Sequence, residues 1–397
     1  MRNLLALVGG AMLVETVLFT SLAPLLPRYS DSLGLSKFGA GLLVGAYAAG
    51  GLAGALPGGW LASNRGVKVA LVCGLALLSV FSVVFGLAGS VWLLDLSRFG
   101  QGVGASCAWT GALAWLVVQA PRERRGELIG IAVGTAGAGA ILGPAAGAVA
   151  TVVGVAATYV AIAVVAGALA VWALHVPVAG TGAGQSLGLL LPAARRPGIA
   201  SALWLLALPS LAFGVLGVLA PLGLGRAGVS GAVIGVVFLV AAGLETVASV
   251  VGGRWADRSG RERPLQASLV GAALACFLLA TGGGAGMLAL FVVLALTAFG
   301  AFFVPAMALL ADQAERAGLE AALAFALLNL AWAPGLFVGS TVGGALADAT
   351  SDSVSYVVLA LLCLFTLPAL RHSLRLERAI ETAEDSAQTQ PSSSSLS

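Results

Sequence analysis

Long apolar runs alternate with short polar turns along almost the whole chain. Each run has about 20 residues or more, which is the length that a helix needs to cross the hydrocarbon core of a bilayer. The runs lie at about 4–26, 36–57, 68–90, 91–118, 127–150, 154–176, 199–223, 229–252, 264–283, 286–311, 320–346 and 353–371. This pattern predicts an all-α integral membrane protein with about twelve transmembrane helices.

Composition strengthens this prediction. Hydrophobic residues make up 59% of the chain and charged residues 9%, whereas a soluble domain has about 25% charged residues. Most of the 20 Lys and Arg residues fall on one side of the map of spans. The positive-inside rule therefore predicts a multi-pass protein of the cell membrane with both termini in the cytoplasm. The basic run Arg122–Arg125 permits a nucleic-acid surface as a rival interpretation, but a short loop between two spans accounts for it, and we expect no nucleic-acid partner.

A charged, glycine-bounded loop occurs twice. The stretch Gly59–Lys68 returns in altered form as Gly253–Glu262, and the offset is 253 − 59 = 194 residues, close to half of the 397 residues. Each copy closes one apolar run and opens the next, which is typical of a membrane protein built from a duplicated unit. We expect two pseudo-symmetric six-helix bundles at 1–177 and 199–373, joined by a cytoplasmic linker at 178–198 and followed by a disordered cytoplasmic tail at 374–397.

Charged residues inside the predicted spans are costly unless they face water or a partner. Glu15 lies roughly 16 Å along its helix and Arg98 about 10 Å from the opposite end of its span, so both reach a similar depth in a core about 30 Å thick. This similar depth predicts an ion pair between Glu15 and Arg98, whose attraction is lost when Glu15 binds a proton. A permanent structural ion pair is the alternative. Asp95, one turn before Arg98, competes as its partner. Glu245 is either a site for a proton or cation, or an acid hydrogen-bonded to a neighbour such as Thr246.

A glycine strip runs along the fifth predicted span. Glycines four residues apart form a flat surface for packing another helix, and a proline in the strip bends its own helix. Nucleotide binding by Gly137, Gly139 and Gly143 is excluded because no strand precedes them and no acidic residue follows. The strip consists of Gly130, Gly139, Gly143, Pro144 and Gly147.

These motifs resemble those of the major facilitator superfamily, closest in pattern to its twelve-helix drug:proton antiporters. The duplicated loop resembles the signature Gly-x-Leu-Ala-Asp-Arg-x-Gly-Arg-Lys, and Arg98–Ala105 resembles Arg-x-x-x-Gly-x-Gly. The glycine strip resembles Gly-x8-Gly-x3-Gly-Pro-x2-Gly-Gly, and Pro24–Pro27 is a looser match. The resemblance covers about residues 4–371. It implies the major facilitator fold, in which two halves rock about a site near the midplane, and export in exchange for protons.

The resemblance also implies that the duplicated loops act as gates. An acid in such a loop docks on the N-terminus of a helix of the opposite half and holds the cytoplasmic side closed; a plain solvated turn is the alternative. The second copy keeps the acid, Asp257, where the first has Ser63. The gating residues are Gly59, Ser63, Arg65, Gly66, Lys68, Gly253, Asp257, Arg258, Gly260 and Arg261.

We therefore expect a secondary active transporter, not an enzyme, that exports small hydrophobic or amphipathic compounds as a monomer by proton-coupled alternating access. No metal and no cofactor is expected, and the proton is the coupling ion. The candidates for lining the substrate cavity are Tyr47, Gln101, Trp109, Trp115, Trp204, Phe213, Asn329 and Trp332. A narrow-substrate metabolite importer or exporter of the same superfamily is the alternative. A membrane-embedded enzyme or a lipid-handling protein is disfavoured, because the chain has two histidines and no clustered metal ligands or nucleophile–base pair.

Overall fold

The computed structural model describes residues 1–121, 124–178, 190–260, 262–319, 321–368 and 370. Eleven helices in these ranges are long and apolar enough to cross a membrane, and a shorter apolar helix follows at Asp352–Pro368. The prediction of an all-α membrane protein with about twelve spans is therefore confirmed. The tail at 374–397 and most of the expected linker at 178–198 lie outside the described residues.

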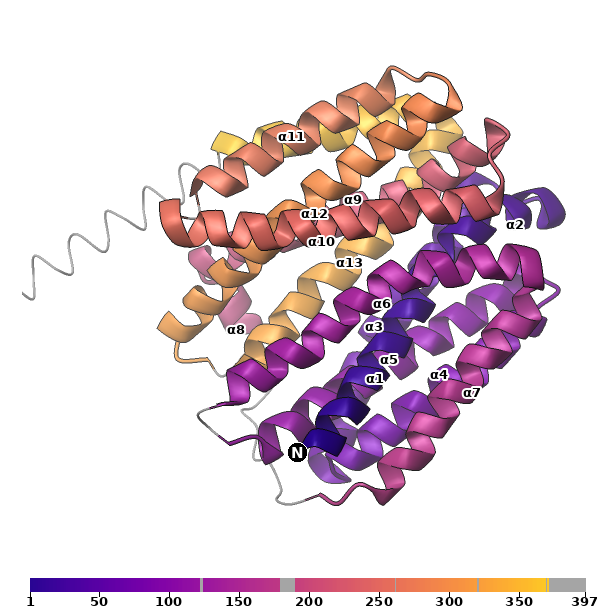
Figure 1. The fold of residues 1–397 in the computed structure, drawn as a ribbon. Helices are drawn as coiled ribbons and strands as arrows, with labels where there is room; N and C mark the ends of the chain where they lie inside the picture. Colours follow the sequence, from indigo (N-terminus) through magenta and orange to yellow (C-terminus); the bar gives the residue numbers. More distant parts are fainter. Residues whose placement is uncertain (122–123, 179–189, 261, 320, 369, 371–397) are drawn as a thin grey trace, which may run out of the picture.

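The helices form two groups that lie side by side (Figure 1). The N-terminal group consists of α1 (Arg2–Thr20), η1 (Ala23–Leu25), α2 (Leu26–Leu33), α3 (Lys37–Asn64), α4 (Val67–Leu87), α5 (Val91–Gln119), α6 (Arg125–Val153) and α7 (Val155–His175). The C-terminal group consists of α8 (Leu190–Ala194), α9 (Pro197–Arg226), α10 (Gly231–Ser259), α11 (Glu262–Ala280), α12 (Ala285–Arg316), α13 (Ala321–Ala349) and the last helix, Asp352–Pro368. We call these groups the N half and the C half.

The long helices run up and down, so each half has two ends. We call the end at which α1 starts and α3 finishes the Met1 end, and the end at which α3 starts the Lys37 end. Serine side chains cap helices at the Lys37 end: Ser36, Ser90 and Ser230 accept hydrogen bonds from backbone amides in the first turns of α3, α5 and α10. Such caps satisfy amides that have no partner within the helix.

The duplication is visible in the backbone. Helix α3 follows Ser36 and is followed by a turn at Gly66, whereas α10 follows Ser230 and is followed by a turn at Gly260. Both offsets are 194 residues (230 − 36 and 260 − 66). Gly66 has φ 101° and Gly260 φ 79°, which are left-handed values that favour glycine. The tight turns expected in the two loops are present.

Two predicted spans differ from the helices observed. The first is broken, because α1 ends at Thr20 and the chain passes through η1 before α2. Pro24 lies in η1 and Pro27 in the first turn of α2, and proline lacks the amide that a continuous helix needs. The second span was expected to end near 57, but α3 continues through Pro57 to Asn64. The repeated loop is thus largely the last turns of a helix.

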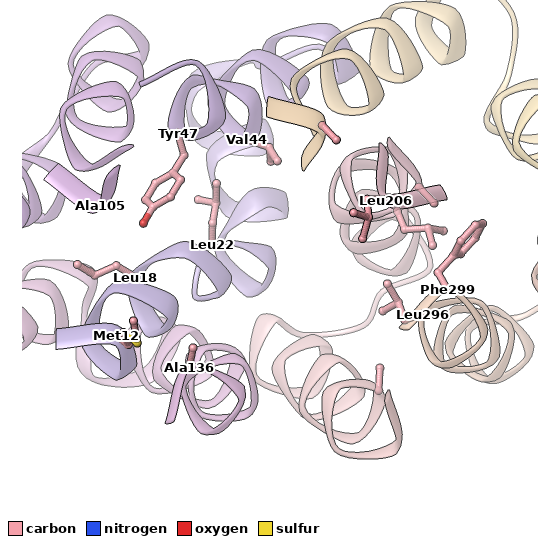
Figure 2. Close-up of a cluster of buried hydrophobic side chains, with 14 of the residues drawn as sticks. Met12, Leu18, Leu22, Val44, Tyr47, Ala105, Ala136, Leu206, Leu296 and Phe299 are labelled. Atoms are coloured by element: carbon pink, nitrogen blue, oxygen red, sulfur yellow. The ribbon is translucent and has the colours of Figure 1, made fainter. Parts of the chain in front are cut away.

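The two halves meet closely at the Lys37 end through small residues. Along α3 and α13, a Cβ on Gly41 would collide with the backbone carbonyl of Ser340, so only glycine fits. Along α6 and α10, a Cβ on Gly235 would lie 2.8 Å from the Pro144 carbonyl oxygen and against Ala148. We call the α3–α13 contact the first seam and the α6–α10 contact the second seam. Away from the seams, each half has buried hydrophobic side chains of its own, such as Met12 and Leu18 in the N half (Figure 2).

A charged cluster crosses the first seam at the Lys37 end. The Asp348 carboxylate accepts hydrogen bonds from the backbone amides of Lys37 (3.1 Å) and Phe38 (2.8 Å), so an acid of the C half caps helix α3 of the N half. The Lys37 ammonium donates to the Ala347 carbonyl at 3.0 Å and lies 2.6 Å from the Asp352 carboxylate. Arg226 pairs with the other oxygen of Asp352. We call Lys37, Asp348, Asp352 and Arg226 the charged cluster.

Candidate functional site

Glu15 lies on α1 and is 7% exposed, although it carries a carboxyl group. Three side chains donate hydrogen bonds to this carboxylate: Tyr47 from α3 at 2.5 Å, Trp109 from α5 at 2.7 Å and Thr16 at 3.0 Å. Hydrogen bonds to a charged group are worth about 1.5–3 kcal/mol each. The carboxylate is therefore held by donors from three helices of the N half.

Arg98 lies on α5 and is 1% exposed. Its guanidinium donates to the backbone carbonyls of Leu18 (2.9 Å) and Phe19 (3.3 Å) and to the side-chain oxygen of Gln101 (3.0 Å). It also lies 4.5 Å from the centre of the Tyr47 ring, which is a cation–π contact. The charge of Arg98 is thus surrounded by carbonyl oxygens and an aromatic face.

The expected direct pair between Glu15 and Arg98 does not form, so this prediction was wrong. The reason is that α1 ends at Thr20 and leaves its last carbonyls without helical partners, which attract the guanidinium instead. The two charges nevertheless share Tyr47, whose hydroxyl contacts Glu15 while its ring contacts Arg98. Figure 2 shows this ring reaching from α3 toward Leu18 of α1.

Asp95 is not a partner of Arg98 either. One of its carboxylate oxygens is buried without a hydrogen bond in the described part of the chain. Gln101, expected in the substrate cavity, is fully buried and joins Arg98 to Ser82 through its amide. It belongs to the network around Arg98.

The other cavity candidates separate into two groups. Trp115 is fully buried below Lys68, and Trp204 is exposed and donates to Thr366 of the last helix. In the described part of the chain neither tryptophan makes a ring-to-ring contact with another cavity candidate; Trp115 lies in the N half and Trp204 in the C half. Phe213 on α9 lies 5.7 Å from Trp332 on α13, measured between ring centres, and Asn329 lies one turn before Trp332.

A third aromatic residue completes this C-half cluster. Phe303 on α12 lies 5.2 Å from Trp332 in an edge-to-face arrangement. It was not among the sequence candidates, because the sequence does not show which of the many phenylalanines in apolar runs face one another. We call Phe213, Phe303 and Trp332 the aromatic cluster.

Glu245 lies on α10 and faces α12. A Cβ on Gly300 would overlap the Glu245 side chain, so this glycine makes the space that the glutamate occupies. Thr246 donates to the carbonyl of Ala242 and not to Glu245, so the hydrogen bond of the alternative interpretation is absent. In the described residues Glu245 has no hydrogen bond or ion pair.

The glycine strip of α6 packs against α1, the helix that carries Glu15. A Cβ on Gly139 would lie 2.7 Å from the carbonyl oxygen of Leu13, and Cβ atoms on Gly143 and Gly147 would collide with Thr20 and with the carbonyl of Ser21. Gly130 has open space around it, and Pro144 lies inside α6. The strip therefore fixes α1 to α6 around the break that follows Thr20.

The duplicated loops lie at the Met1 end. Ser63 donates to the Trp60 carbonyl of its own helix at 3.0 Å, and Lys68 donates to the Leu174 carbonyl of α7 at 2.9 Å. The other loop glycines, Gly59 and Gly253, lie within α3 and α10, and Arg65 and Arg258 are exposed. The side chain of Asp257 and the whole of Arg261 lie outside the described residues. The gating role of the loops stays a prediction.

An open pocket of about 680 Å³ also lies at the Met1 end, between the start of α1 and the ends of α5 and α7. Its walls include Arg2, Gln119 and Pro177. None of the site residues considered above lines it, so it does not correspond to the expected central cavity.

Comparison with known proteins agrees with this architecture. Residues 8–222 and 202–395 match the profile of the Major Facilitator Superfamily. Two solved structures of a bacterial homologue of the human lysosomal transporter Spinster, both inward-facing, superpose with TM-scores of 0.76 and 0.77. They cover 94% of this chain and 98% and 96% of theirs, at 15% and 16% identity.

More similar sequences match only part of the chain. The quinolone resistance protein NorA of Staphylococcus aureus is 32% identical over 124 residues, which are 31% of this chain and 32% of NorA. The synaptic vesicular amine transporter of Mus musculus is 28% identical over 136 residues, 34% of this chain and 26% of that protein. The matched segment thus spans about a third or less of these relatives.

The profile covers nearly the whole chain in two overlapping parts, and the helices repeat at the same offset as the sequence. Its helices are those of a multi-pass membrane protein. The chain belongs to the Major Facilitator Superfamily.

Proposed function

We propose that the chain exports small hydrophobic or amphipathic compounds across the cell membrane in exchange for protons. The observation that carries this proposal is Glu15, a membrane-embedded carboxylate that is 7% exposed and lacks a direct cationic partner. A carboxylate in such a place binds and releases protons with a change in charge that its surroundings feel strongly.

The described side chains support an apolar substrate. The aromatic cluster offers three ring faces and edges in the C half, and the hydrogen-bond donors near Glu15 are already used by its carboxylate. A sugar or a phosphate needs many polar partners, whereas aromatic rings suit bulky apolar groups. The partial similarity to a quinolone resistance protein and to an amine transporter points the same way.

Alternating access gives the two ends of the molecule their roles. The Met1 end holds the basic loops and is the cytoplasmic end by the positive-inside rule, so the Lys37 end faces outward. The seams and the charged cluster close the Lys37 end, which supports a state that opens toward the cytoplasm. The protein works as a monomer whose two halves rock about the space between them.

The test is transport into proteoliposomes with an imposed pH gradient, using a ligand found by thermal stabilisation of the purified protein. We expect uphill, gradient-dependent accumulation of the ligand, and we expect Glu15→Gln to abolish it while the protein stays folded. The control is Glu127→Gln, because Glu127 is an exposed acid paired with Arg124 and far from Glu15 in the chain. If the unmodified protein moves the ligand independently of the pH gradient, this result would favour a facilitative metabolite transporter.

A further inference from the structure

Tyr47 is the residue on which the structural features around Glu15 converge. Its hydroxyl donates the shortest hydrogen bond to the Glu15 carboxylate, at 2.5 Å, and its ring lies 4.5 Å from the Arg98 guanidinium. Its side chain is 6% exposed. Tyr47 therefore contacts both the Glu15 carboxylate and the Arg98 guanidinium.

The Arg-x-x-x-Gly-x-Gly motif explains how Tyr47 reaches this position. A Cβ on Gly102 would collide with the backbone carbonyl of Tyr47, so glycine at this place lets α3 approach α5. The motif arginine, Arg98, lies one turn earlier and covers the ring of the same tyrosine. Two residues of one motif thus fix the backbone and the side chain of Tyr47.

Helix α3 also joins this site to the other half. Two residues before Tyr47, a Cβ on Gly45 would lie 2.8 Å from the Ser340 hydroxyl and 3.0 Å from the Phe337 ring of α13. Tyr47 therefore lies two residues from a contact of the first seam, on one of the two helices that form it.

We propose that Tyr47 is the positioning residue that couples the protonation of Glu15 to Arg98 and to helix α3. This inference rests on the proposed proton-coupled function. With Glu15 ionised, the phenol holds the carboxylate by a charge-assisted hydrogen bond, and the guanidinium above the ring strengthens the phenol as a donor. When Glu15 takes up a proton from water this bond becomes a weaker neutral one, and Tyr47 is released from α1.

The charged and titratable groups around Glu15 are few. Tyr47 faces it from α3 and Arg98 from α5, while α6 presents its glycine strip. On α7 the hydroxyl of Tyr159 shares a hydrogen bond of 2.7 Å with Ser21 and does not contact Glu15. The charged Lys68 of α4 lies at the Met1 end beside Leu174.

Trp109 supplies a signal that needs no substrate. Its indole donates directly to Glu15, so protonation of Glu15 changes the environment of this fluorophore. The experiment is a pH titration of tryptophan fluorescence on the purified, ligand-free protein. We expect one transition that Trp109→Phe and Glu15→Gln each remove.

Tyr47→Phe keeps the ring and removes the hydroxyl. Loss of a hydrogen bond to a charged carboxylate of about 1.5–3 kcal/mol moves the fluorescence transition toward higher pH by about one to two units. The matched control is Tyr159→Phe, which also removes a buried phenol hydroxyl from the N half but does not touch Glu15. Its transition stays where the unmodified protein has it. Thermal melting of both variants checks that they fold alike.

A double-mutant cycle tests whether Arg98 acts through this tyrosine. Arg98→Lys is expected to move the transition in the unmodified protein and to move it less in the Tyr47→Phe protein, because coupled residues are not additive. Additive shifts, equal shifts for Tyr47→Phe and Tyr159→Phe, or no Trp109-dependent transition overturn the proposal. These readouts do not depend on transport, so a failure of proton coupling in vesicles is distinguished from a failure of Tyr47 to act on Glu15.

Discussion

The two seams between the halves are related by the duplication, yet they are closed by different means. In the first seam, α3 and α13 approach through Gly41 and Ser340, and Asp348 caps the start of α3. In the second seam, α10 and α6 approach through Gly235 and Ala148. The position equivalent to Asp348 at the offset of 194 residues is Gly154, at the end of α6. Close packing is common to both seams, but the described charges that cross between the halves lie at the first.

The opposite asymmetry occurs at the Met1 end of the same two long helices. Helix α3 of the first seam has Ser63 in its terminal loop, whereas α10 of the second seam has Asp257 at the equivalent position. Helix α3 thus receives an acid of the other half at its start, whereas α10 carries an acid near its own end. A duplicated fold can therefore keep its packing in both copies while its charges are distributed unequally between them.

One measurement can follow the first seam and the second. Spin labels are attached at Asp31→Cys and Ser351→Cys, two exposed positions at the Lys37 end that lie in different halves. Opening of the Lys37 end then appears as a longer distance between the labels in pulsed electron paramagnetic resonance. The four native cysteines, at positions 73, 107, 276 and 363, are replaced by alanine for this purpose. The quantity compared in the next three predictions is the ratio of open to closed populations.

The largest effect is expected from overpacking either seam. Gly41→Ala or Gly235→Ala places a methyl group against backbone atoms of the opposite half. Overpacking costs about 1–3 kcal/mol, so the ratio of open to closed populations rises about 5- to 150-fold. Gly130→Ala is the control, because its Cβ would meet open space. A population ratio that does not respond in one seam would show that this seam does not hold the Lys37 end closed.

Removal of the cap of α3 is expected to have the next largest effect. Asp348→Ala leaves the Lys37 and Phe38 amides without their acceptor. The loss of a helix cap, about 1–2 kcal/mol, raises the ratio of open to closed populations about 5- to 30-fold. Asp348→Asn keeps an acceptor and loses the charge, so it separates the hydrogen bonds from the electrostatics. If both variants matched the unmodified protein, the first seam would depend on packing alone.

A smaller effect is expected from the ion pairs of the charged cluster. Lys37→Met removes the contact with Asp352, and both side chains of this pair are about a fifth exposed (21% and 20%). Partly exposed pairs contribute about 0.2–1 kcal/mol, so loss of this pair raises the ratio of open to closed populations about 1.5- to 5-fold. The effect should shrink as salt is added. A salt-independent change would indicate that the aliphatic part of the lysine matters more than its charge.

The smallest effect is expected at Ser63. Its hydroxyl bonds only to the carbonyl of Trp60 in its own helix, so Ser63→Ala should leave the transport rate within about twofold. Asp257→Asn should impair turnover more, because the resemblance to the superfamily implies that an acid at this position docks on a helix N-terminus. Equal rates for the two variants would contradict the view that the charges at the Met1 end are divided unequally.

Much of the fold was predictable from local sequence. Apolar runs of membrane-spanning length identified the helices, and Gly66 and Gly260 identified the turns, because their left-handed conformation favours glycine. The extension of α3 past Pro57 was missed, since a proline inside a membrane helix is tolerated where neighbouring helices supply the missing contacts.

The candidate site was predictable as a set of residues but not as a set of contacts. Glu15, Arg98, Tyr47 and Trp109 were all selected, because charges and polar aromatics are unusual in apolar spans. The contacts among these residues were not predicted correctly, because depth along a helix does not determine the direction in which a side chain points. Arg98 turns toward Leu18 and Phe19 only because α1 breaks after Thr20.

The sequence by itself determined the membrane class, the number and order of the spans, the duplication and the superfamily. These properties depend on hydrophobic length and on short motifs, whose physical causes are local. Only the tertiary structure decided that Tyr47 lies between Glu15 and Arg98 and that Asp348 caps α3 from the other half. Such contacts join residues from 32 to 311 positions apart, so they depend on how whole helices pack.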